Sequence, residues 1–545
     1  MRLSRTIGLC AAAVVGVQGA WGAGMGWRGD GTGRYPDARP PTHWSPVSNV
    51  LWKTELPARG NATPVLAGGR IYVGAEPTDV ICLDAADGRV LWRASNTYFD
   101  ELPPAEAEAA RQEAQKAAAL RAELGKLEER RKALQRQIDA LAAARARLPE
   151  LEREAALFAD PPALAARIAE LQGKAAETEA APTGRRRERR GAVAETPAER
   201  LKLLRDESLL KAEIAKARDT LARDEPREAE WRREAEELQR QAEDLRTRQL
   251  APLTRYELPP THEANGYSTD TVVSDGEHVF VLRGNGMAAC YTLDGERRWL
   301  RRVGRPTEGW GQSASPVLAG GFLVVQMEGL AALDRKTGAT VWTAPAARAR
   351  WGTPVVATVG GEEIIITPNG DFVRAADGKL LAEKLAKLDY NAPILHDGVV
   401  YFIEQGGKAF RLPETAAKPF QPQTLWTAAT IPGDRYYASP VWVDGLIYAI
   451  NRKSELTAID AQSGEPVYTR RLDLEATVYS SLTLAGRYLY ASGEKGLTVV
   501  FEPGREYNEV ARNRLEPFRS CPVFRDNRLY IRGAQHLYCI AEAAP

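Results

Sequence analysis

The most regular feature of the chain is a recurring pattern of apolar and polar positions. A small residue, usually followed by proline, opens a run of alternating β-branched and aromatic residues, and many copies close with D-x-x-x-G-x-x-x-W. This alternation is typical of strands. A spacing of roughly 40 residues predicts one four-stranded sheet per copy, as in the blades of a β-propeller. The eight openings lie at Pro64, Thr271, Pro316, Pro354, Pro393, Pro440, Leu482 and Pro522.

The two ends of the repeat region complement each other. The last unit, residues 520–542, has three predicted strands and lacks the closing phrase. Residues 49–56 have the closing-strand pattern, with no strands before them. We therefore expect this first strand to complete the last sheet. The result is an all-β, eight-bladed propeller whose ring leaves no sheet edge open.

The closing phrases resemble a known repeat. "LDAADGRVLW" (83–92), "LDRKTGATVW" (333–342) and "IDAQSGEPVY" (459–468) are similar to the tryptophan-docking repeat of the PQQ-like (quinoprotein alcohol dehydrogenase-like) β-propeller family. The resemblance covers all eight units, of which the fourth, fifth and seventh are degenerate. It implies that closing-strand tryptophans pack between neighbouring blades, here Trp52, Trp92, Trp299, Trp342 and Trp426.

A helical insertion separates the first two units. Between about 104 and 250 the chain is rich in Ala, Glu, Arg and Leu, with apolar residues every three to four positions. One stripe runs from Leu120 to Leu148 and a second from Leu203 to Leu245, which predicts an antiparallel coiled-coil hairpin on the funnel face of the propeller. Pro226 should interrupt the second helix. Whether the hairpin is a solvated spacer or a partner-binding or oligomerising arm stays open.

The N-terminus has the pattern of an export signal. Arg2 and Arg5 precede an apolar run and small residues, so residues 1–23 are predicted to be a signal peptide. No later stretch is long and apolar enough for a transmembrane helix. We expect an exported protein, periplasmic or extracellular. The predicted domains are an extended segment (24–46), the closing strand with blade 1 (47–100), the coiled-coil insertion (101–261) and blades 2–8 (262–545).

The charge and the cysteine content limit which classes of ligand and bond the sequence predicts. The net charge of +1 gives no basic field for nucleic acid, and "RRRERR" (185–190) is read as a solvated tip of the hairpin. The five histidines show no metal-ligand spacing. Four cysteines remain after the signal, and they permit three pairings, Cys82 with Cys539 among them, between which the sequence does not choose. They are Cys82, Cys290, Cys521 and Cys539.

A candidate binding ring follows from the repeat. The residues three positions before each opening should meet at the mouth of the funnel, where aromatic rings and arginine would form a platform for a flat or extended ligand. Packing under loops would give a similar set. These residues are Asn61, Ser268, Ser313, Trp351, Tyr390, Tyr437, Tyr479 and Arg519.

Two functional hypotheses follow from the resemblance. The favoured one is a non-enzymatic, exported scaffold that binds protein partners or a ligand through the propeller face or the arm, with no cofactor. The alternative is a PQQ- and calcium-dependent dehydrogenase of alcohols or sugars. Family enzymes use calcium ligands, a general-base Asp and often a pair of adjacent cysteines. No adjacent cysteine pair and no recognisable catalytic motif occurs in this sequence.

Overall fold

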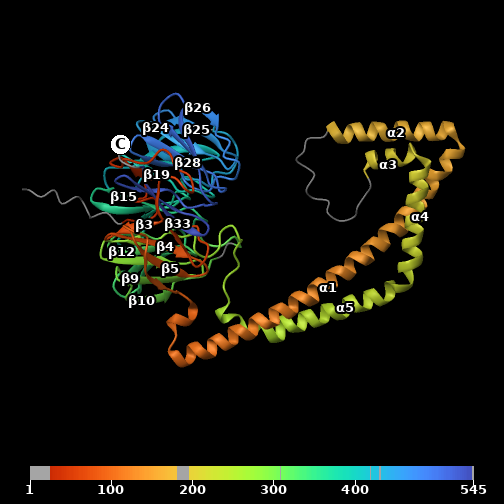
Figure 1. Cartoon of the computed structure of the whole chain (residues 1–545), viewed down its shortest axis with the longest axis horizontal. Helices are drawn as coiled ribbons and strands as arrows, with labels where there is room; N and C mark the ends of the chain where they lie inside the picture. Colours follow the sequence, from red (N-terminus) through yellow and green to blue (C-terminus); the bar gives the residue numbers. More distant parts are fainter. Residues whose placement is uncertain (1–24, 181–195, 307–308, 418, 429–430, 543–545) are drawn as a thin grey trace, which may run out of the picture. The chain divides into compact units, whose positions relative to one another are not determined.

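The computed structural model describes residues 25–180, 196–306, 309–417, 419–428 and 431–542. The predicted signal peptide and the arginine-rich tip at 185–190 therefore lie outside the described residues. The chain forms two compact units, one of residues 1–107 with 258–545 and one of residues 108–257. The first is the β unit and the second is the helical unit (Figure 1).

The β unit contains eight sheets in its described residues. Sheet 1 consists of β3 (Val65–Ala67), β4 (Arg70–Ala75), β5 (Asp79–Asp84) and β6 (Val90–Ala94), and sheet 2 of β7 (Val273–Ser274), β8 (His278–Leu282), β9 (Met287–Thr292) and β10 (Arg297–Arg302). Sheet 3 consists of β11 (Val317–Ala319), β12 (Phe322–Gln326), β13 (Leu330–Asp334) and β14 (Thr340–Ala344), and sheet 4 of β15 (Val355–Val359), β16 (Glu362–Ile366), β17 (Phe372–Arg374) and β18 (Leu380–Ala382).

Sheets 5 to 8 continue the same up-and-down order. Sheet 5 consists of β19 (Ile394–His396), β20 (Val399–Glu404), β21 (Gly406–Arg411) and β22 (Gln423–Ala428), and sheet 6 of β23 (Val441–Val443), β24 (Leu446–Ile450), β25 (Glu455–Asp460) and β26 (Pro466–Arg471). Sheet 7 contains β27 (Thr483–Ala485), β28 (Tyr488–Ser492), β29 (Leu497–Glu502) and β30 (Asn508–Arg514), and sheet 8 contains β31 (Val523–Arg525), β32 (Arg528–Arg532) and β33 (His536–Ile540) with β2 (Val50–Glu55). The prediction of a mostly β chain of repeated four-stranded sheets is confirmed.

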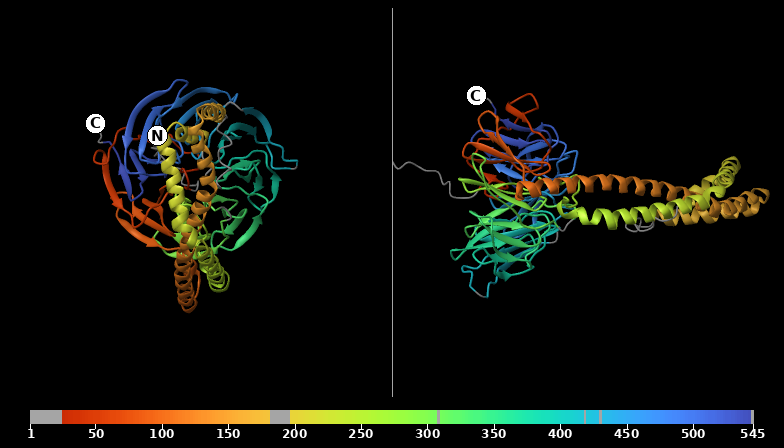
Figure 2. Two further views of the ribbon diagram at one scale, coloured as in Figure 1. Left: turned by 90° about the vertical axis from the view of Figure 1, so that its right-hand side faces the viewer. Right: turned by 90° about the horizontal axis from the view of Figure 1, so that it is seen from below.

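Two strands come from the N-terminal part of the chain. β2 pairs antiparallel with β33, with Trp52 opposite Cys539, and so supplies the fourth strand of sheet 8. β1 (Arg34–Tyr35) pairs parallel with β27 and adds a fifth strand to sheet 7. The sheets of the β unit follow one another around an axis (Figure 2).

Neighbouring sheets are joined by one repeated hydrogen bond. Just before the first strand of a sheet, a backbone N–H donates to the hydroxyl of the equivalent residue in the next sheet. Two sheets lack the hydroxyl that would accept this bond. In sheet 5 the equivalent residue is Ala392, which has no hydroxyl for a bond from sheet 4, and in sheet 8 it is Cys521, which has a thiol. The donor–acceptor pairs are Thr63–Thr271, Thr271–Ser315, Ser315–Thr353, Ala392–Ser439, Ser439–Ser481 and Cys521–Thr63, at 3.0–3.2 Å.

The tryptophans of the closing strands contact the next sheet. The indole N–H of Trp299 donates to the carbonyl oxygen of Arg335 at 2.8 Å, and its ring lies against Gly338 in the turn before β14. The same packing recurs four times, with Trp52 on Gly88, Trp92 on Gly295, Trp342 on Gly378 and Trp426 on Gly464. A glycine at the turn therefore leaves the space into which each indole fits.

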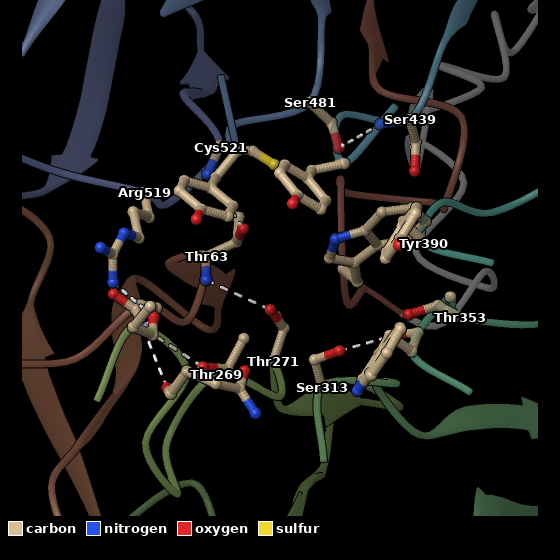
Figure 3. Close-up of a pocket in the computed structure, with 18 of the residues that line it drawn as sticks. Thr63, Thr269, Thr271, Ser313, Thr353, Tyr390, Ser439, Ser481, Arg519 and Cys521 are labelled. Carbon is tan, nitrogen blue, oxygen red and sulfur yellow. Dashed lines mark hydrogen bonds between the residues drawn. The ribbon is translucent and has the colours of Figure 1, made fainter. Parts of the chain in front are cut away.

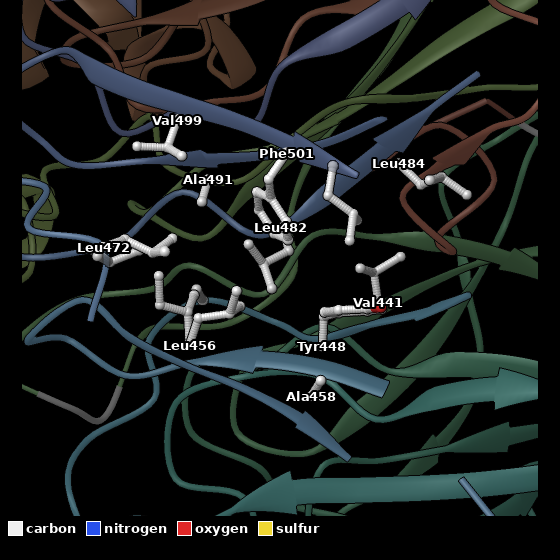
Figure 4. Packing of buried hydrophobic residues seen from close by; sticks show 14 of the residues in the cluster. Val441, Tyr448, Leu456, Ala458, Leu472, Leu482, Leu484, Ala491, Val499 and Phe501 are labelled. Atoms are coloured by element: carbon white, nitrogen blue, oxygen red, sulfur yellow. The ribbon is translucent and has the colours of Figure 1, made fainter. Parts of the chain in front are cut away.

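Apolar side chains fill the space between neighbouring sheets. Between sheets 6 and 7, for example, Tyr448 and Leu456 face Leu482 and Phe501, all of them buried (Figure 4). The alternation along each strand produces this core because every second side chain points to the same face of its sheet.

The helical unit is an antiparallel pair with an irregular end. α1 (Pro104–Ala156) runs antiparallel to the segment formed by α4 (Glu207–Asp224) and α5 (Glu228–Asp244). Ion pairs fix this direction, because Arg130 pairs with Glu234 at 2.8 Å while Glu152 pairs with Arg218 at 2.6 Å. Of the predicted stripes, Leu134, Ile138, Leu141, Leu203, Leu210, Ile214, Ala217, Trp231, Ala242 and Leu245 are buried.

Two of the prolines lie at breaks between helices. Pro226 lies in the 3-10 turn η4 (Glu225–Arg227) between α4 and α5, as the sequence predicted. After the turn η2 (Leu157–Ala159), Pro161 opens α2 (Pro161–Ala180), because proline fits the first turn of a helix. α2 packs on α3 (Pro197–Leu204), a pair that the predicted two-helix hairpin did not include.

Irregular helical turns complete the described elements. η1 (Tyr98–Glu101) precedes α1, and the π-helical η5 (Leu245–Leu250) and the 3-10 η6 (Ala251–Tyr256) follow α5. Within the described ranges, no helix combines the length and the apolar character needed to cross a bilayer.

The indole–glycine contact predicts a specific stability effect. In Gly338→Ala, the new Cβ would lie 2.6 Å from the Trp299 ring at a backbone φ of 72°. Gly321→Ala is the matched control, because Gly321 has a φ of 81° and open space around it. We expect Gly338→Ala to lower the free energy of unfolding by about 1–3 kcal/mol more than the control, measured in urea. Equal losses in the two variants would contradict this packing.

A second prediction concerns the helical unit. Trp231 of α5 is buried against Leu134 and Ile138 of α1. We expect Trp231→Ala to destabilise this helix pair by about 3–5 kcal/mol, because a large apolar group leaves a cavity. Hydrogen exchange of α1 and α5 should accelerate, while exchange of the β strands should not. Leu209→Ala, at a residue that is 38% exposed, serves as the control with little effect.

Candidate functional site

A cavity of about 360 Å³ lies where the loops before the first strands of the sheets converge. We call it the funnel pocket (Figure 3). Its lining residues are Trp27, Asn61, Thr63, Ala264, Asn265, Thr269, Thr271, Trp310, Ser313, Trp351, Gly352, Thr353, Tyr390, Arg435, Tyr437, Ser439, Tyr479, Ser481, Arg519 and Cys521. They come from every sheet of the β unit, so the pocket exists only when all the sheets are assembled.

Seven of the eight residues in the predicted binding ring line this pocket. They are Asn61, Ser313, Trp351, Tyr390, Tyr437, Tyr479 and Arg519. Ser268 does not, and this part of the prediction needs correction. The side chain of Ser268 is buried and donates to Glu76 at 2.7 Å, while Thr269 occupies the lining position of sheet 2.

The error at Ser268 is a shift of one residue in the repeat alignment. Thr271 is equivalent to Thr63, as their hydrogen bond indicates, so the opening of the second unit is Val272 and not Thr271. Sheet 2 has no proline at this position to mark the register. Since successive side chains of an extended segment point to opposite sides, one residue of shift exchanges a lining side chain for a buried one.

One side of the pocket is aromatic. Trp351 and Tyr390 are stacked with ring centroids 5.4 Å apart, and Tyr390 meets Tyr437 edge to face at 4.9 Å. Tyr437 then stacks on Tyr479 at 4.9 Å. We call these four residues the aromatic arc. Burial raises the pKa of Tyr479, so its hydroxyl stays protonated at neutral pH.

Two arginines give this aromatic side a positive charge. Arg519 lies 4.9 Å from the Tyr479 ring and pairs with Glu494 at 2.9 Å. Arg435 lies over Tyr390 and donates to the Tyr437 hydroxyl at 3.2 Å, an interaction that raises the pKa of its guanidinium. In the part of the chain that the structure describes, Arg435 has no carboxylate partner within ion-pair distance.

The opposite side of the pocket is polar. Asn61 donates to the carbonyl oxygens of Ala264 and Asn265 at 3.1 and 3.0 Å. Asn265 in turn donates to the carbonyl of Trp310 at 2.9 Å, and His262 stacks on the Trp310 ring at 3.8 Å. These bonds hold residues 258–269, which follow the helical insertion along the chain, in the wall of the pocket.

Two acidic residues, of which Glu404 is buried, brace the loops that carry the lining residues. Glu404 accepts from the backbone N–H of Asp389 at 2.5 Å, next to Tyr390, and burial raises its pKa to about 7. Glu76 accepts from the N–H groups of Tyr267 and Ser268 at 2.9 Å. The loops are thus fixed by carboxylates that lie behind the pocket.

The lining of the pocket includes a tryptophan that the sequence analysis missed. Trp27 belongs to residues 25–46, which we call the N-terminal segment, and it also lines a second cavity of about 610 Å³. Met25 exchanges backbone hydrogen bonds with Ser274 of sheet 2, while Arg28 donates to the carbonyls of Pro440 and Leu482 in sheets 6 and 7. The segment therefore joins sheets on different sides of the axis.

The chemistry of the lining does not fit a calcium-bound quinone. None of the lining residues in the described structure is a carboxylate, and the described residues contain no group of three or more His, Cys, Asp or Glu placed to hold a metal. The four cysteines are buried free thiols, and Cys82 is not joined to Cys539. Hydroxyls, amides, aromatic rings and arginines are what the pocket offers a ligand.

One family model matches the repeat region of the chain. The family model described as outer membrane protein assembly factor BamB matches residues 47–161 and 261–415. No protein of curated function matches the chain.

Solved structures also match the chain, at low similarity. BamB from Moraxella catarrhalis has 14% identity and a TM-score of 0.40, over 50% of this chain and 81% of that chain. Quinohemoprotein alcohol dehydrogenase ADHIIG from Pseudomonas putida HK5 has 11% identity and a TM-score of 0.46, over 94% of this chain and 80% of that chain. These likenesses carry no argument about activity. The repeat pattern and the family match identify the chain as a member of the PQQ-like β-propeller family.

Proposed function

We propose that this protein is an exported, non-enzymatic binding scaffold, built on a closed eight-bladed propeller. The funnel pocket is the binding site, and its occupant is a peptide segment of a partner protein that carries apolar or aromatic side chains and an acidic group. The helical unit provides a second surface for partners or for self-association. The hydrogen bond from Cys521 to Thr63 and the pairing of β2 with β33 support closure of the ring.

The aromatic arc is the observation that carries the proposal. Aromatic rings and arginines contribute most of the binding energy at protein interfaces, because they bury large areas and lose little conformational entropy. Four such rings lie in sequence along one wall, with Arg435 and Arg519 beside them. Because the described lining carries arginines and no carboxylate, the pocket attracts an acidic group and disfavours a cationic one.

The absence of catalysis is part of the proposal. The lining hydroxyls of Thr63, Thr271 and Ser439 are engaged in the bonds between sheets, so they are structural groups and not activated nucleophiles. No histidine lines the pocket in the described structure to act as a base for them. We therefore propose that no quinone or calcium is required.

The first test is site-specific photocrosslinking in cells that produce the protein. A benzophenone amino acid at position 310, which is 51% exposed at the pocket, should give an adduct with one partner, identified by mass spectrometry. The same group at position 341, 50% exposed on β14, is the control and should not give that adduct.

The aromatic arc should determine this adduct. Tyr437→Ala removes a ring that contacts both neighbours, and we expect it to weaken the adduct at least tenfold, from a loss of about 2 kcal/mol. Tyr437→Phe, which keeps the ring, should retain most of it. An adduct that persists unchanged in Tyr437→Ala would exclude the pocket as the partner site.

A separate test addresses the alternative of a quinone enzyme. Purified protein incubated with pyrroloquinoline quinone and calcium, then desalted, should carry no stoichiometric quinone by absorbance and native mass spectrometry. The reason is that, among the described residues, the lining offers no carboxylate to ligate calcium. A quinone bound one to one, with dye-linked oxidation of an alcohol, would establish the dehydrogenase instead.

A further inference from the structure

The second cavity, of about 610 Å³, is distinct from the funnel pocket. Its lining comes from the N-terminal segment, from sheet 2 and from the first strands of sheets 3 to 6. Among the lining residues, it shares Trp27 and Thr353 with the funnel pocket. A cavity of this volume is large enough for a small organic molecule. The proposed function makes no use of it.

The strands around the second cavity give it an apolar wall. In the part of the chain that the structure describes, β11, β15 and β19 are edge strands of their sheets, whereas β27 in sheet 7 is paired with β1. Apolar side chains of these three edge strands line the cavity and are half-buried. They are Val317, Leu318, Val355, Val356 and Leu395. An apolar molecule in the cavity would remove this surface from water, which favours binding.

One cation in this cavity lacks a polar partner. Arg34 of β1 lines the cavity, and its guanidinium lies over the ring of Trp442, 5.3 Å from the ring centroid. Its Nε is buried without a hydrogen-bond partner, and no carboxylate of the described residues lies within ion-pair distance. Stacking on the indole orients the guanidinium but leaves its N–H donors unsatisfied. An anionic group in the cavity would satisfy them.

The other charged residues that line the second cavity already have partners within the protein. Arg335 pairs with Asp275 at 3.3 Å. Glu363 accepts from a backbone N–H in the turn between β11 and β12 at 2.6 Å. Asp30 accepts from the N–H and the hydroxyl of Thr32 at 3.0 and 2.6 Å. Among the described lining residues, the guanidinium on β1 is therefore the charged group that is left for a ligand.

We propose that the second cavity binds a small amphipathic anion, a molecule with an apolar body and one carboxylate, sulfonate or phosphate group. The anionic group pairs with Arg34, because the planar guanidinium offers parallel N–H donors to two oxygens. The apolar body lies against the half-buried side chains of β11, β15 and β19. A neutral molecule of the same shape leaves the guanidinium unpaired and binds more weakly.

The test uses 4-benzoylbenzoate, a small photoreactive molecule that carries a carboxylate on an apolar body. It is irradiated with the purified full-length protein, and the labelled peptides are identified by mass spectrometry. We expect saturable labelling of β11 or β15, since no residue of these strands lines the funnel pocket. Benzophenone lacks the carboxylate and is the neutral control. At equal concentration it should label these strands about tenfold less, because it makes no charge-assisted hydrogen bond.

The role of Arg34 is tested by comparing the two probes in variants. Arg34→Gln should lower labelling by 4-benzoylbenzoate about tenfold and leave labelling by benzophenone unchanged, because only the charged contact is lost. The variant keeps the pairing of β1, which rests on backbone bonds such as that from the Leu484 N–H to the Gly33 carbonyl at 2.9 Å. Arg34→Lys keeps the charge and should retain most of the labelling. Arg39→Gln, at an exposed residue of the same segment outside the cavity lining, should have no effect.

Three results would overturn the inference. One is equal labelling of β11 and β15 by the two probes, and another is labelling by 4-benzoylbenzoate that is the same in Arg34→Gln as in the unmodified protein. The third is labelling confined to peptides of the funnel pocket. The measurement needs no partner protein, and Tyr437→Ala should not change it. Failure of the partner crosslink at position 310 and failure of this site are therefore distinguishable.

Discussion

The junction between neighbouring sheets is the constraint on which the rest of the β unit depends. Each four-stranded sheet is too small to bury both of its faces alone, so its apolar side chains must pack on the next sheet. Two contacts set the geometry of that packing. An indole from the closing strand fits over a turn glycine at the periphery, and a backbone N–H bonds to a hydroxyl near the axis. The same pair of contacts recurs at the junctions of sheets 1 with 2, 2 with 3, 3 with 4, 5 with 6 and 8 with 1.

The pocket is a consequence of these junctions. Once the hydroxyl-bearing residues are linked around the axis, the residues two positions earlier in each unit point toward the common centre. Those positions carry rings in four consecutive sheets and small polar groups in sheets 1, 2 and 3. The pocket is therefore aromatic on one side and polar on the other. This asymmetry arises from the order of the repeats along the chain.

The N-terminal segment adds what the repeats cannot supply. A symmetrical set of sheets leaves a channel along its axis. Here Trp27 and Thr353 line both the funnel pocket and the second cavity of about 610 Å³. Arg28 is held by carbonyls at the openings of sheets 6 and 7, which places a buried cation between these two sheets. The local chemistry of the pocket thus depends on a segment that precedes the first repeat.

The sequence by itself determined the class of fold, the insertion and most of the ring of lining residues, because strand periodicity, turn glycines and the proline before most of the first strands are local signals that repeat. It failed at Ser268, where the second unit lacks that proline and the register shifted by one residue. Only the tertiary structure decided the positions of Trp27 and Arg28. The physical reason is that residues 25–46 have no periodic pattern, and their partners Ser274, Pro440 and Leu482 are hundreds of residues away in the chain.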